Sequence, residues 1–99
     1  MGIETLQTGK PYVIAITGRL DTFSSPQLAS YTRGLYEQGI NDIVVDMSEC
    51  EFVSSAGLRE IVLMQKRSTQ GGSLVFRNVQ PEVLNIFEFT GYLRILTIE

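Results

Sequence analysis

Histidine, tryptophan and paired cysteines are all missing from this sequence of 99 residues. It contains no histidine and no tryptophan, and Cys50 is its single cysteine. Because histidine is the commonest general base and the commonest transition-metal ligand, its absence argues against hydrolase chemistry. A lone cysteine cannot form an intrachain disulfide or a thiolate-rich zinc site. We therefore expect no metal, no cofactor and a reducing compartment.

Long apolar runs and an excess of positive charge are also missing. No apolar stretch approaches the roughly 20 residues of a transmembrane helix, and residues 1–10 lack the basic and apolar regions of a signal peptide. The net charge is −3 and the isoelectric point is near 4.9. These features predict a cytoplasmic protein without membrane insertion, and they leave no basic field for binding nucleic acid.

The hydrophobic content of 43% supports a folded globule, and the length fits a single domain over residues 1–99. Hydrophobic patterns and turn residues predict strands at 3–8, 12–18, 42–47, 73–77 and 95–98, with helices opening near residues 25, 56 and 81. An N-terminal strand pair followed by alternating helices and strands indicates an α/β fold. We expect a mixed sheet with parallel crossovers and about three to four packed helices.

Two adjacent serines, Ser54 and Ser55, stand where the apolar strand at 42–47 leads into the helix at 56–69. The run Ile43-Val44-Val45 is typical of a strand covered on both faces. A hydroxyl at the start of a helix is usually a cap that stabilises the helix by about 1 kcal/mol. The same position favours an anion, because free N–H groups and the helix dipole meet there. Spacing alone favours the cap.

Five motifs occur in an order that resembles the STAS domain family, which includes sulfate transporter domains and anti-sigma factor antagonists. They are GRLD at residues 18–21, IVVDMS at 43–48, FVSSAGL at 52–58, GG at 71–72 and FEFTGY at 87–92. The resemblance covers essentially the whole chain, and it implies the mixed sheet of that family.

The antagonist branch of this family carries a phosphorylatable serine two residues before the loop glycine, which implies Ser55 here. Ser54 is a minor alternative for the same role, at a position where the branch often has aspartate. Ala56 replaces a common serine or threonine. In this branch the unphosphorylated antagonist binds an anti-sigma factor serine kinase and releases a sigma factor, and a phosphatase resets the serine.

The resemblance also implies a partner-binding surface around the serines. Asp21 and Thr22 fall on its rim, and a solvated turn is an equal reading for Asp21. On the helix at 56–69, Leu63 and neighbouring Met64 are expected to be partly exposed near Ser55. The full set of expected partner contacts comprises Asp21, Thr22, Ser54, Ala56, Gly57, Arg59, Leu63 and Met64.

The resemblance implies a non-enzymatic binding module that is a monomer or a weak dimer. An alternative is a STAS assembly module of a transporter or stress-sensing complex without sigma control. A third reading makes Ser55 a catalytic nucleophile, but the chain has no histidine to activate it and no Gly-x-Ser-x-Gly elbow.

Overall fold

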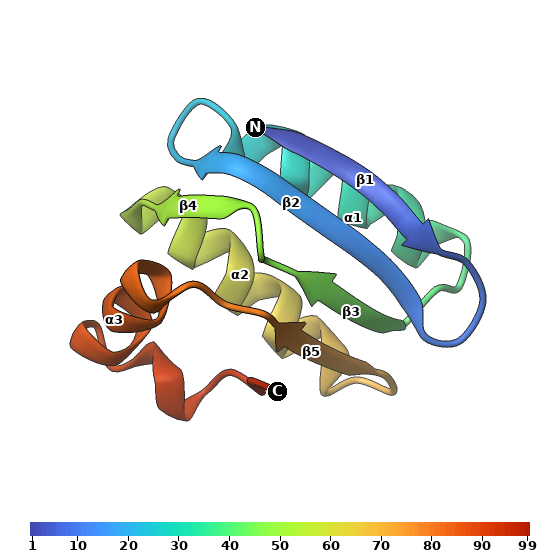
Figure 1. Ribbon diagram of the computed structural model, residues 1–99. Coiled ribbons are helices and arrows are strands. Elements are labelled where there is room, and N and C mark those ends of the chain that lie inside the picture. Colours follow the sequence, from blue (N-terminus) through green and yellow to red (C-terminus); the bar gives the residue numbers. More distant parts are fainter.

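Five strands form one mixed sheet in the computed structural model, which describes residues 1–99 (Figure 1). They are β1 (Gly2–Gln7), β2 (Tyr12–Leu20), β3 (Asp42–Asp46), β4 (Cys50–Val53) and β5 (Ser73–Arg77). The strand order is β1-β2-β3-β5, with β1 antiparallel to β2 and the β2–β3 and β3–β5 pairs parallel. The expected mixed sheet with an N-terminal strand pair is confirmed.

The long strand β2 has two parallel partners on the same edge. Its first half, from Tyr12 to Ala15, pairs with β3, and its second half, from Gly18 to Leu20, pairs with β4. The turn at residues 47–49 separates β3 from β4. The carboxyl ends of β2 and β4 are therefore neighbours, so the segments that follow them meet at one end of the sheet.

Three α-helices and one short 3₁₀ helix complete the chain. They are α1 (Ser25–Glu37), α2 (Ser55–Ser68), α3 (Pro81–Phe89) and η1 (Tyr92–Arg94). α1 and α2 lie behind the sheet in Figure 1 and contact each other, while α3 packs beside β4. Each of the crossovers β2–α1–β3 and β4–α2–β5 joins parallel strands through a helix, as such connections require.

The core lies between the sheet and the helices. Alternate residues of β2, β3 and β5 enter it, because successive side chains point to opposite faces. Ile14 and Ile16 of β2 and Phe76 of β5 are fully buried there. Each such side chain contributes about 1.5–3 kcal/mol relative to exposure. Val44 lies on the other face and is only half-buried, so the expectation that its strand is covered on both faces was wrong.

Two elements differ from the sequence-based expectations. Strand β4 occupies residues expected to be loop, because its partner is the distant end of β2 and no local pattern reveals that pairing. The expected last strand at 95–98 is reduced to one isolated bridge between Phe76 and Ile98, and η1 precedes it. The chain turns at Gly91, whose φ of 82° is left-handed, and this sends residues 92–94 into a helical turn.

Candidate functional site

Ser54 caps α2 and joins it to β4. Its backbone is extended, with φ −82° and ψ 176°, and its Oγ accepts a hydrogen bond from the Gly57 N–H at 3.3 Å. Its own N–H donates to the Leu20 carbonyl oxygen at 2.9 Å. This arrangement matches a helix N-cap, which is worth about 1 kcal/mol. The structure thus gives Ser54 a definite capping role.

Ser55 is the first residue of α2, and its side chain is exposed. Its hydroxyl makes no hydrogen bond within the chain, in contrast to the hydroxyl of Ser54. The first N–H groups of a helix have no intrahelical acceptor, and the positive end of the helix dipole lies beside them. Ser55 therefore presents a free hydroxyl at a position that accommodates negative charge.

The loop between β2 and α1 lies next to this serine pair, and the Asp21 carboxylate holds it together. Asp21 Oδ1 accepts hydrogen bonds from the N–H groups of Phe23 at 3.0 Å and Ser24 at 3.1 Å. The Asp21 N–H donates to Ser24 Oγ at 2.8 Å, and that hydroxyl donates to the Arg19 carbonyl oxygen at 2.8 Å. The hydrogen bond from the Ser24 N–H is the main reason that the pKa of the Asp21 carboxyl lies below its usual value. This carboxylate is a structural element of the loop, and Thr22 stands exposed beside it.

Gly57 and Met64 were both expected at the partner surface, and the structure places both in the interior. Gly57 is buried, and a Cβ added there would come within 2.7 Å of the Leu20 carbonyl oxygen. Met64 is only 2% exposed. The buried face of α2 consists of Gly57, Leu58, Ile61 and Met64. Val62, which was expected on this face, is only half-buried, so the helix is rotated in a way that points Met64 inward.

The other expected contacts remain accessible to different degrees. Arg59 is exposed and Ala56 is half-buried, and both lie within one turn of Ser55. Leu63 is 52% exposed, as expected. It lines a groove of about 480 Å³ between α1 and α2, where the Arg67 guanidinium lies 4.7 Å from the centre of the Tyr36 ring. Leu63 therefore stands two helical turns from the serine, at the edge of any surface centred on Ser55.

Three residues of this end of the molecule were missed by sequence reasoning. Phe23 is 94% exposed, and Arg19 lies with its guanidinium 4.3 Å from the centre of the Phe52 ring. The position of Phe23, two residues after the GRLD motif, was an available signal. The pairing of Arg19 with Phe52 depends on β4, which no local pattern predicted.

The described side chains show no arrangement for metal binding, since no group of three or more cysteine, aspartate or glutamate residues is placed to hold an ion. None of the helices has the length and apolar character needed to cross a membrane.

Comparison with known proteins relates the whole chain to one family. A family model described as the STAS domain matches residues 2–99. BtrV of Bordetella bronchiseptica is 29% identical over 87 residues, covering 87% of this chain and 75% of BtrV. The anti-sigma-B factor antagonist of Bacillus subtilis is 28% identical over 99 residues, covering 99% of this chain and 90% of that protein.

The Bacillus protein SpoIIAA, an anti-sigma factor antagonist, has the same fold in two solved forms. The unphosphorylated form has a TM-score of 0.75 at 17% identity and covers 99% of this chain and 87% of its own. The phosphorylated form has a TM-score of 0.72 at 18% identity, with coverages of 99% and 91%.

Proposed function

This chain belongs to the STAS domain family, and we propose that it is an anti-sigma factor antagonist whose binding is switched by phosphorylation of Ser55. The observation that carries the proposal is the free, exposed hydroxyl at the first position of α2. Relatives that align with nearly the whole chain are named anti-sigma factor antagonists, which supports the partner class. Ser54 is assigned the role of helix cap and only a minor role as an alternative site of phosphorylation.

The local structure supports phosphorylation without unfolding. A phosphoserine adds about −1.5 to −2 charges at pH 7. At a helix N-terminus this charge is stabilising by roughly 0.3–1 kcal/mol. The cap on Ser54 and the core beneath Gly57 do not involve the Ser55 hydroxyl, so both survive the modification. The phosphate acts through charge and bulk at the docking surface.

In the proposed cycle, the unphosphorylated chain binds an anti-sigma factor serine kinase in the cytoplasm and thereby releases a sigma factor. The kinase then transfers a phosphate to Ser55, which ends the complex, and a phosphatase restores the hydroxyl. The chain acts as a monomer or weak dimer that binds and is modified. A role for Ser55 as a catalytic nucleophile has no support, because its hydroxyl contacts no base.

The partner surface is centred on the β4–α2 junction and the β2–α1 loop. Asp21 and Thr22 belong to the β2–α1 loop, and Ala56 and Arg59 belong to the first turns of α2. A buried like-charge contact across such an interface costs several kcal/mol, which is enough to dissociate a moderately tight complex. The phosphate therefore needs no conformational change to switch binding off.

The test is phosphorylation by the anti-sigma kinase of the same organism with ATP, followed by intact mass and peptide mapping. We expect one phosphate on Ser55 in the wild type, none in Ser55→Ala, and normal modification of Ser54→Ala. A phosphate mapped to Ser54, or no modification of a chain that still binds the kinase, would contradict the phosphoswitch. Stable capture of a transport or stress-sensing complex instead of a kinase would favour the assembly-module alternative.

A further inference from the structure

Phe23 is an aromatic side chain that contributes nothing to the core. It is 94% exposed at the tip of the β2–α1 loop. The loop that carries it is held by the hydrogen bonds of Asp21 and Ser24, one of which is the bond from the Phe23 N–H to Asp21 Oδ1 at 3.0 Å. The ring is therefore presented by an ordered backbone, and its binding would involve little loss of loop entropy.

A second exposed group lies at the same end of the sheet. Arg19 of β2 pairs in register with Phe52 of β4, and its guanidinium stacks 4.3 Å from the ring centre. Arg19 takes part in neither of the chain's two salt bridges, which join Lys10 with Asp42 and Arg77 with Asp46. An opposite charge close to it within the chain is that of Asp21, whose pKa it helps to lower. The positive charge is oriented by the aromatic ring and available to an acidic group.

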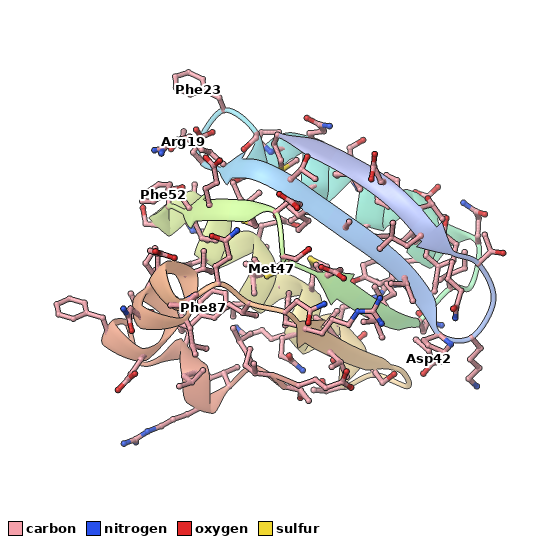
Figure 2. All side chains as sticks on the ribbon, in the orientation of Figure 1. Arg19, Phe23, Asp42, Met47, Phe52 and Phe87 are labelled. Atoms are coloured by element: carbon pink, nitrogen blue, oxygen red, sulfur yellow. The ribbon has the colours of Figure 1, made fainter.

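These side chains flank the phosphorylation site. Figure 2 shows Phe23, Arg19 and Phe52 gathered at the end of the molecule where β2 and β4 finish. Ser55 follows Phe52 by three residues, and the Ser54 N–H is bonded to the Leu20 carbonyl oxygen next to Arg19. The aromatic and basic surface formed by Arg19, Phe23 and Phe52, which we term the Phe23 surface, is continuous with the serine junction.

We infer that the Phe23 surface is the anchor for the same kinase that reads Ser55, through an apolar pocket that receives the Phe23 ring and an acidic side chain that pairs with Arg19. This inference rests on the proposed function. Interfaces are commonly dominated by a few aromatic and arginine anchors at a patch that becomes fully desolvated. Charge complementarity favours an acidic partner group here, because the Arg19 guanidinium is exposed, stacked on Phe52 and engaged in no salt bridge.

The inference also explains how phosphorylation dissociates the complex. An acidic partner group drawn to Arg19 would face the phosphate that appears on Ser55 nearby. The phosphate repels that group, and like charges at an interface are strongly unfavourable. Reversal of the Arg19 charge should therefore weaken binding in the same direction as phosphorylation.

The experiment compares Phe23→Ala with Phe89→Ala, because Phe89 at the end of α3 is 93% exposed and provides a matched control. Binding of each unphosphorylated chain to the purified anti-sigma kinase of the same organism is measured by calorimetry. We expect Phe23→Ala to raise Kd about 30-fold, the change typical of loss of one hot-spot side chain. Phe89→Ala should change Kd less than twofold, and Arg19→Glu should raise it at least tenfold. Equal Kd values for wild type and Phe23→Ala would overturn the inference.

Ser55 phosphorylation, followed by mass spectrometry on the same samples, separates the two proposals. If the kinase modifies Ser55 but its Kd is unchanged by Phe23→Ala and Arg19→Glu, the phosphoswitch is supported and the Phe23 surface is refuted. If the kinase binds through Phe23 and never modifies Ser55, the surface stands and the phosphoswitch fails. If the kinase neither binds nor modifies the wild type, both fail together.

Discussion

The substitution Gly57→Ala tests whether the serine junction is held by the close approach of α2 to β2. A Cβ at this position would lie 2.7 Å from the Leu20 carbonyl oxygen, 2.9 Å from Leu20 Cγ and 3.0 Å from Val53 Cγ1. The first distance is far shorter than an ordinary van der Waals contact of 3.4 Å. Since that neighbour is backbone at the paired carboxyl ends of β2 and β4, the first turn of α2 has to move outward.

The size of the effect follows from three opposing contributions. Overpacking of a filled interior costs about 1–3 kcal/mol. Movement of the helix start weakens the Ser54 cap, which is worth about 1 kcal/mol. Alanine regains about 1 kcal/mol through its higher helix propensity. The net loss of unfolding free energy is about 1–3 kcal/mol, which lowers Tm by about 4–24 °C in a domain of this size.

Thermal and urea unfolding followed by circular dichroism measure this change, and Gly34→Ala is the matched control. Gly34 lies inside α1 with no atom within 4 Å of an added Cβ. The same substitution there should raise the unfolding free energy by about 0.5–1 kcal/mol, because only helix propensity changes. If Gly57→Ala stabilised the protein as Gly34→Ala does, the close packing of α2 against Leu20 would be refuted.

Three further perturbations are expected to have distinct outcomes. Ser54→Ala should lower the urea-derived unfolding free energy by about 1 kcal/mol through loss of the cap, and equal losses in Ser55→Ala would contradict the assigned roles. Burial alone would raise the pKa of the Asp46 carboxyl, but its hydrogen bonds, led by the one from the Ser48 N–H, hold that pKa below the usual 3.8. The folded protein therefore loses stability when this carboxylate is protonated, so the unfolding free energy should fall as pH drops below about 4. The fall should be less steep in Asp46→Asn, which has no carboxyl at this position. Burial raises the pKa of the Cys50 thiol, so Ellman's reagent should label it only as urea unfolds the chain, and rapid labelling of the folded protein would disprove its burial.

Much of the fold follows from local pattern. The strand pair at the N-terminus, the helices and the strand at 73–77 each have a hydrophobic period or a turn residue that marks them, and each appears in the structure within a few residues of its expected bounds. The element that was missed, β4, is four residues long and pairs with residues more than thirty positions earlier. A short strand of this kind is specified by its partner and leaves little local signal.

The candidate site also combines features that the local sequence predicts with features that only tertiary contacts decide. The sequence alone indicates that Ser55 precedes Gly57, that GRLD precedes a helix and that Leu63 is exposed. The sequence alone, however, allowed Met64 to be a surface residue, because several rotations of α2 bury a reasonable apolar face. The packing of α2 against the sheet and α1, including the close approach of Gly57 to Leu20, selects the rotation that turns Met64 inward.

By itself, then, the amino-acid sequence determined the alternation of strands and helices, the family and the candidate phosphoacceptor, because these depend on residues close together in the chain. The tertiary structure decided which of two adjacent serines is the cap and which is free, and it brought Arg19 and Phe52 together beside them. Those outcomes depend on the parallel pairing of β2 with β4, which sets two distant segments side by side at one end of the sheet.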